Sequence, residues 1–198
     1  MRGGQRQRQR PAGRPGASAL ERHAAFFDRD GDGLVAPAET LASLRDLGIG
    51  APLAALLTAL IHTALGPITQ RRPALDIRVE AIARGKRGKS SSVFGPDGHF
   101  GPRAFARLSA GPEGRDRALT LRELRALIAS NPESRSKNAL EDFFSWAETR
   151  ALFCLAADTT RREDGRDLPA LSLKRLRSFY DGDLFYALAR RRRLARRA

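Results

Sequence analysis

Apolar residues recur at helical intervals in several separate stretches of this chain, and they predict helices joined by short polar loops. The first predicted helix covers 18–27, where Ser18 and Glu21 have the S-x-x-E spacing of a capping box. Pro37 suits the first turn of a second helix, because its fixed φ and missing N–H cost nothing there. The same reasoning predicts further helices over 121–130, 140–155, 171–179 and 183–197.

The most apolar stretch of the chain is 47–70, which contains no charged side chain. Pro52 and Pro67 bracket a predicted helix over 53–66, about 21 Å long at ~1.5 Å per residue. A bilayer hydrocarbon core is ~30 Å thick, so this helix is too short to span it. Two interpretations remain open: a buried core helix, or a hairpin or interfacial helix that dips into one leaflet. His62 lies in this segment, where we expect a core or interfacial role.

Composition indicates a folded chain with basic ends. Of the net charge of +14, residues 1–22 contribute +5 and residues 190–198 contribute +6. We expect a disordered basic arm at 1–17, one domain over 18–189 and a basic tail at 190–198, with the last helix suited to an anionic membrane surface. The arginines could bind phosphates non-specifically, but no base-reading motif accompanies them, so no specific nucleic-acid partner is predicted. Cys154 is the one cysteine, which excludes an intrachain disulfide, and we expect it in the core.

A cluster of carboxylates stands out in this basic chain. The sequence from Asp28 to Glu39 reads D-x-D-x-D-G-x5-E, which is the spacing of an EF-hand calcium loop. Ca²⁺ takes six to eight oxygen ligands. The spacing predicts these from the carboxylates of Asp28, Asp30 and Asp32, the carbonyl of Leu34 and a bidentate Glu39. Mg²⁺ is the weaker candidate, because it demands stricter octahedral geometry.

EF-hands normally pair through short strands at the eighth loop position, which here is Val35. Degenerate relatives of the acidic loop are predicted at 97–102, at 116–123 and around Asp164-Gly165, where most acidic positions are missing. The predicted fold is therefore mainly α, with EF-hand-like helix pairs, one intact calcium loop, degenerate EF-like partners and a central apolar helix. We expect one calcium ion per chain.

These motifs together resemble the caleosin family, also called plant and fungal peroxygenases. The resemblance rests on "HAAFFDRDGDGLVAPAET", "VFGPDGHF", "ALTLRELRALIASN", the aromatic helix through Trp146 and "YDGDLF", which follow the family's order over most of 20–188. It implies a calcium-binding protein at the cytosolic face of lipid-droplet or endoplasmic-reticulum membranes. It also implies haem-dependent peroxygenase activity, in which oxygen passes from a fatty-acid hydroperoxide to an unsaturated lipid.

The resemblance further implies two histidines that serve haem b. One matches His23, the candidate iron ligand and catalytic residue. The other belongs to a tract resembling K-H-G-S-D, where this chain has Lys86-Arg87-Gly88-Lys89-Ser90. Because a guanidinium stays protonated and has no lone pair, Arg87 cannot bind iron. The alternative function is therefore a non-catalytic calcium-binding protein of lipid droplets or membranes that has lost the haem site.

Overall fold

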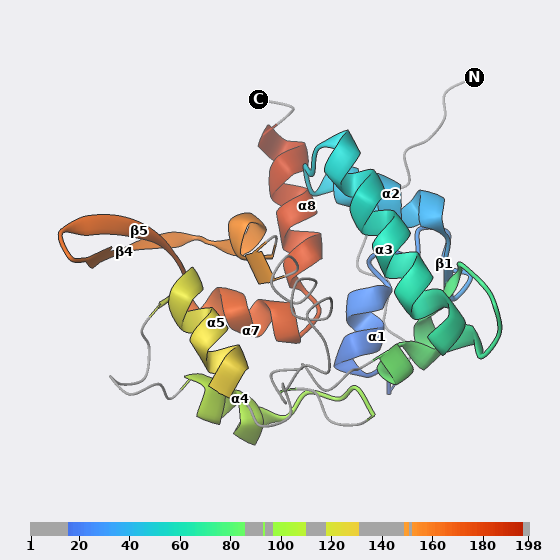
Figure 1. Ribbon diagram of the computed structural model, residues 1–198, viewed down its shortest axis with the longest axis horizontal. Helices are drawn as coiled ribbons and strands as arrows, with labels where there is room; N and C mark the ends of the chain where they lie inside the picture. The colour runs from blue at the N-terminus through green and yellow to red at the C-terminus, as the bar shows by residue number, and fades with distance from the viewer. Residues whose placement is uncertain are drawn as a thin grey trace.

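The computed structural model describes residues 16–85, 93, 97–109, 118–130, 149–150 and 152–195, and within these it is rich in helix with two small sheets (Figure 1). The N-terminal part contains α1 (Ala19–Ala24), β1 (Leu34–Val35), α2 (Pro37–Asp46), α3 (Ala51–Gln70), β2 (Ile77–Arg78) and the 3₁₀ helix η1 (Val79–Gly85). The C-terminal part contains α4 (Pro102–Ser109), β3 (Leu119–Thr120), α5 (Leu121–Ser130), β4 (Thr159–Glu163), β5 (Arg166–Leu171), α7 (Leu173–Tyr180) and α8 (Leu184–Ala195).

The start of α1 has the predicted capping box. The backbone N–H of Glu21 donates to the Ser18 hydroxyl at 3.2 Å, and the N–H of Ser18 donates to the Glu21 carboxylate at 2.6 Å. These two bonds satisfy donors that the first turn of a helix leaves free. Pro37 is the first residue of α2, as its restricted φ predicts.

Helix α3 differs from its predicted bounds. It runs from Ala51 to Gln70 and continues through Pro67, so it has 20 residues rather than the 14 between the prolines. At ~1.5 Å per residue its length is about 30 Å. Proline removes only one hydrogen bond, and the Thr69 hydroxyl supports the last turn by donating to the carbonyls of Leu65 and Gly66. The helix ends where Arg71 adopts a left-handed φ of 56°.

The partner of β1 is also different from those predicted. Val35 faces Ile77 and Leu34 faces Arg78 in an antiparallel pair. The chain thus forms two consecutive helix–loop–helix units, α1 to α2 and α3 to η1, whose loops meet through β1 and β2. Within the second unit, Gly66 lets the loop after α3 fold back against that helix, because a Cβ there would clash with the carbonyl oxygen of Ala74.

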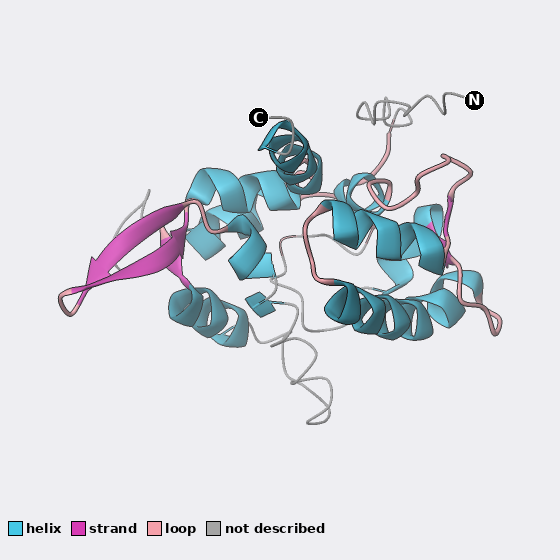
Figure 2. Ribbon diagram, turned by 90° about the horizontal axis from the view of Figure 1, so that it is seen from above, coloured by secondary structure: helices cyan, strands magenta, loops and turns pink. Residues whose placement is uncertain are grey.

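In the C-terminal part, β3, β5 and β4 form a three-stranded antiparallel sheet. Strands β4 and β5 form a hairpin that extends away from the helices (Figure 2). Asp164 and Gly165 are its two-residue turn, with φ of 47° and 76°. The prediction of a degenerate metal loop around these residues is therefore wrong, because Asp-Gly here has the positive φ values of a tight hairpin. Cys154 is exposed rather than in the core as predicted.

Several hydrophobic clusters hold these elements together. The largest joins α1 to the C-terminal elements, and smaller ones lie under α2, α3 and α8. Helix α8 packs against the N-terminal part through a cluster of Phe26, Leu47 and Ala189. Residues 1–15 and most of the predicted helix over 140–155, including Trp146, lie outside the described residues.

Candidate functional site

The acidic loop connects α1 to α2. Ligand oxygens of Asp28, Asp30 and Asp32 all lie within 4.8 Å of one another. Backbone N–H groups hold them there: Gly31 and Gly33 donate to Asp28 at 2.8 and 3.0 Å. Gly33 has a φ of 87°, which glycine adopts without strain and which turns the chain into β1.

The loop folds back onto Glu39 in the first turn of α2. One oxygen of the Glu39 carboxylate accepts from the backbone N–H of Arg29 at 2.5 Å, and the other accepts from Ala36 at 2.8 Å. Burial raises the pKa of Asp28, and the nearby charges of Glu39 and Asp32 add to this, while hydrogen bonds from Gly31 and Gly33 oppose it. Four carboxylates so close together favour a bound cation that offsets their repulsion.

The donor set suits Ca²⁺. Carboxylate oxygens of the three aspartates converge, and Glu39 accepts from backbone N–H groups of the same loop. The Leu34 carbonyl at the start of β1 would be the backbone donor that the spacing predicts. All these donors are hard oxygens, which Ca²⁺ prefers, and no nitrogen or sulfur ligand of a transition metal stands among them. A calcium ion held there would offset about half of the negative charge of the four carboxylates and fix α1 relative to α2.

His62 is buried and connects α3 to α2 at the residue that follows Glu39. Its Nδ1 lies 2.6 Å from the Leu75 carbonyl and its Nε2 lies 2.7 Å from the Thr40 hydroxyl. Because a carbonyl only accepts, Nδ1 carries the proton and Nε2 accepts from Thr40. Burial lowers the pKa of His62, which keeps this neutral form. Its core position follows the sequence interpretation, whereas its bond to the residue after Glu39 has no signal in the sequence.

His23 lies on α1 with its ring packed among aromatic side chains. Its ring centroid is 4.9 Å from that of Phe179 and 4.6 Å from that of Phe185. Burial lowers the pKa of His23 to about 4, against a hydrogen bond with the Phe179 backbone that raises it. The imidazole is therefore neutral at pH 7.

A haem does not fit beside His23 in this packing. A neutral imidazole held by a backbone carbonyl has the chemistry of a metal ligand. However, the two phenylalanine rings occupy the space around it. Cavities of about 770 and 260 Å³ lie elsewhere, the first under the β4–β5 hairpin and the second beside α8, and His23 lines neither. The tract from Lys86 to Ser90, where the sequence departs from the expected second histidine, lies outside the described residues.

The buried imidazole of His23 predicts a loss of stability in acid. The pKa is about 4 in the folded chain against 6.5 as the ordinary value, so the unfolded chain binds the proton more readily between these pH values. The free energy of unfolding should keep its maximum contribution from His23 above pH 6.5. It should fall by about 3 kcal/mol as the pH drops towards 4.

Urea unfolding of wild type and His23→Gln at several pH values between 7.5 and 4 checks this prediction. The variant should show a smaller loss, because glutamine does not titrate. The exposed His99 provides the matched control, His99→Gln. Equal acid sensitivity of wild type and His23→Gln would contradict the prediction.

Two features of the structure were missed from the sequence. The strand β2, which pairs with β1, follows a loop without acidic ligand spacing and therefore gives no EF-hand signal. The β4–β5 hairpin did have a signal, since an Asp-Gly pair between two extended segments is a common hairpin turn. That hairpin carries Arg161 to the carboxylate of Glu123 at 2.5 Å.

Comparisons with known proteins agree with the order of the motifs. A family model described as "Caleosin related protein" matches residues 16–189. The chain is 32% identical over 179 residues to a protein of Arabidopsis thaliana named "Probable peroxygenase 4", covering 87% of this chain and 86% of the relative. It is 32% identical over 180 residues to a "Peroxygenase" of Lilium longiflorum, covering 88% and 71% of the two chains. No solved structure matches.

Proposed function

The chain belongs to the caleosin family, and from this we propose that it is a calcium-binding protein of lipid surfaces with peroxygenase-type activity. The observation that carries the proposal is the acidic loop beside α3. Three aspartates converge within 4.8 Å in the loop of the first helix–loop–helix unit, and the second unit begins with α3, which is apolar on its exposed side. Family membership and the names of both relatives support oxygen transfer from a fatty-acid hydroperoxide to an unsaturated lipid.

The two N-terminal helix–loop–helix units form an EF-hand pair in this proposal. Val35 and Ile77, which face each other, both stand at the eighth loop position. The first loop has every acidic ligand. Counting from Ile77, the loop after α3 has Gln70, Arg72, Ala74 and Ala81 at the positions where the first loop has its four acids. It therefore serves as a metal-free partner, and this pair takes one calcium ion.

Helix α3 is the proposed lipid contact. It meets the length and composition of a membrane-crossing helix, yet only 22% of its most apolar window is buried in the protein. Its buried face packs on α2 and η1, whereas Leu53 and Leu56 on the other side are 50% and 55% exposed. An exposed face without charged residues is unfavourable in water and favourable at a lipid surface.

Helix α8 adds a basic surface. Its first residue, Leu184, is buried, whereas Arg190 to Arg193 near its C-terminus are exposed. Each arginine near an anionic membrane contributes about 1 kcal/mol of attraction. Together with α3 this favours the cytosolic face of a lipid droplet or of the endoplasmic reticulum, where the family's lipid association would place the chain.

A second candidate function is a calcium-binding lipid-surface protein without catalysis. The packing of Phe179 and Phe185 around His23 favours it, because it leaves no room for haem there. The two candidates share the calcium loop and α3 and differ only in haem binding and oxygen transfer.

One experiment separates the two candidates. The protein is purified with haem supplied, its Soret band is recorded, and oxygen transfer from cumene hydroperoxide to oleic acid is measured for wild type and His23→Ala. The peroxygenase proposal expects a Soret band and epoxide product in wild type. Their loss in His23→Ala would assign the iron ligand to His23 and would require Phe179 and Phe185 to move from the packing described above. Absence of both from wild type would leave the non-catalytic function.

A further inference from the structure

The chain contains the same local geometry twice. In the first instance β1 leads into α2, and the Ala36 N–H donates to the Glu39 carboxylate at 2.8 Å. In the second, β3 leads into α5, and the Thr120 N–H donates to the Glu123 carboxylate at 2.9 Å. Each short strand pairs antiparallel with a later one, β1 with β2 and β3 with β5.

This equivalence identifies the groups that would meet a cation in the second instance. We call the segment that ends at Glu123 the second loop. Glu39 and the carbonyl of Leu34 are proposed calcium donors of the first loop, five residues apart. Glu123 and the carbonyl of Ala118 have the same separation and the same relation to the strand and helix. The second loop therefore presents a carboxylate and a carbonyl where the first presents two ligands for calcium.

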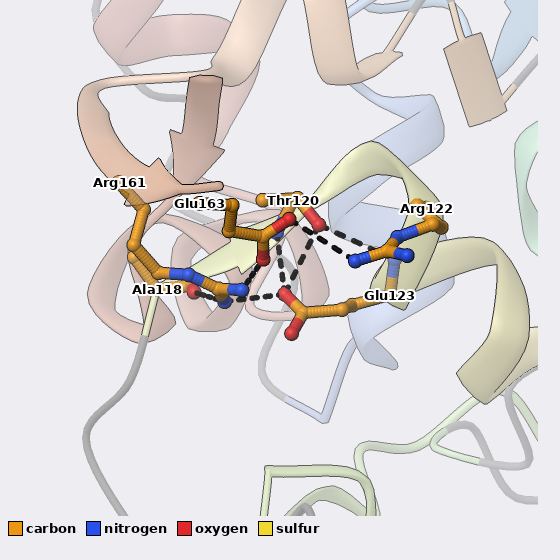
Figure 3. Close-up of polar contacts among 6 residues, drawn as sticks. All are labelled: Ala118, Thr120, Arg122, Glu123, Arg161 and Glu163. Carbon is orange, nitrogen blue, oxygen red and sulfur yellow. Dashed lines mark hydrogen bonds and ion pairs between the residues drawn. The ribbon is translucent and has the colours of Figure 1, made fainter. Parts of the chain in front are cut away.

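A guanidinium occupies that place in the second loop. Nη1 of Arg161, which comes from β4, donates to the Ala118 carbonyl at 3.1 Å and to the Glu123 carboxylate at 2.5 Å (Figure 3). Nη2 of Arg161 forms an ion pair with Glu163. The guanidinium of Arg161 thus contacts one backbone carbonyl and two carboxylates. Oxygen atoms of these kinds are also the usual ligands of a calcium ion.

The arrangement is shielded from water. The side chain of Arg161 is 18% exposed, and those of Glu123 and Glu163 are 24% and 14% exposed. Arg122, which is 80% exposed, binds Glu163 from outside at 3.1 Å. The guanidinium is a permanently charged part of the chain. The positive charge at this place therefore does not depend on calcium concentration.

We propose that Arg161 is a built-in cation that replaces calcium in the second loop. The C-terminal helix–loop–helix is then held together without metal, and calcium acts on the chain only through the first loop. The comparison of the two loops rests on the proposed EF-hand function of the first. This proposal gives the β4–β5 hairpin a structural role, because β4 is the strand that brings Arg161 to the second loop.

The test measures melting and calcium binding in the full chain. Arg161→Gln removes the charge at similar length, Arg161→Lys keeps a charge, and Arg162→Gln is the matched control on the opposite face of β4. In EDTA, Arg161→Gln should lower the melting temperature by roughly 4–10 °C, because Glu123, Glu163 and the Ala118 carbonyl lose the cation that joins them. Arg161→Lys should lose less than half of that, and Arg162→Gln at most about 1 °C.

The response of the melting temperature to calcium is the second measurement. Loss of an ordinary ion pair would not change this response. With the first loop disabled by Glu39→Gln, the chain should bind no calcium in calorimetry. Adding Arg161→Gln to that variant should make millimolar calcium raise its melting temperature by at least about 2 °C, because a cation position has been vacated. Adding Arg162→Gln should give no such response.

Three results would overturn the proposal. Calcium bound by Glu39→Gln alone would show that the second loop takes metal despite Arg161. Equal melting of Arg161→Gln and Arg162→Gln would show that the guanidinium holds nothing together, and a calcium response absent from the Arg161→Gln double variant would make it a plain ion pair. If wild type itself binds no calcium, the proposed function of the first loop fails, while the melting comparison in EDTA still decides the role of Arg161.

Discussion

Replacement of Glu39 by glutamine should weaken calcium binding by at least about 100-fold, the largest loss we expect from a single substitution. In an EF-hand the last acidic residue supplies two oxygens, and an amide supplies one neutral oxygen in their place. The carboxylate of Glu39 also accepts from the N–H groups of Arg29 and Ala36, so it joins both ends of the loop.

Calorimetry and thermal unfolding measure this effect. At free calcium of about 100 times the dissociation constant, binding stabilises the folded wild type by about 2.7 kcal/mol, which corresponds to roughly 5–10 °C in melting temperature. The Glu39→Gln variant should show neither binding heat nor this shift. Glu80→Gln, which changes an exposed acid on η1, is the control and should behave as wild type. A full calcium shift in Glu39→Gln would remove the calcium loop from the proposed function.

The part of the site that could be predicted from sequence is the part made by neighbours in the chain. The acidic loop has all its ligands within twelve residues, so their spacing alone predicts how Asp28, Asp30 and Asp32 converge. The capping box at Ser18 is equally local. Contacts between distant segments have no such signal: Thr40 meets His62 and Glu123 meets Arg161 only because the fold brings different loops together.

The bounds of α3 show why proline is an incomplete predictor of helix ends. Pro67 was expected to terminate the helix, since it lacks the N–H for one bond and crowds the preceding turn. The structure continues to Gln70 because the buried residues on either side of the proline, Gly66 and Thr69, pack and bond in the helical form. Thr69 accepts from the N–H of Arg78 in β2. Tertiary contacts therefore outweighed the local cost.

The added length changes the interpretation of the apolar segment. At about 30 Å, α3 is long enough to cross a hydrocarbon core, whereas the predicted helix was too short. Its buried positions Ala54, Thr58 and His62 nevertheless bind it to the protein along one side. Because that side contacts α2 and η1, the lipid contact in our proposal is the opposite side alone, and the helix lies against the surface rather than crossing it.

The double variant Leu53→Gln/Leu56→Gln should therefore lower partitioning onto phosphatidylcholine vesicles by roughly 10- to 150-fold. Burying a fully exposed leucine side chain in an apolar medium contributes roughly 1.5–3 kcal/mol. Because the two leucines are 50% and 55% exposed in the protein, lipid can supply about half of that gain for each, or about 1.5–3 kcal/mol together. Glutamine keeps the side-chain length and the helix propensity, so circular dichroism should be unchanged.

Flotation with neutral phosphatidylcholine vesicles isolates this apolar contribution, because these vesicles offer the arginines of α8 no anionic headgroups, and high salt screens the remaining electrostatic attraction. Leu75→Gln is the matched control: this leucine is 57% exposed but lies in the loop after α3. If the double variant floats with neutral vesicles as wild type does, α3 is not the lipid contact. In our proposal lipid is the partner of this face, because its exposed leucine side chains are apolar and an apolar surface is favourable against lipid.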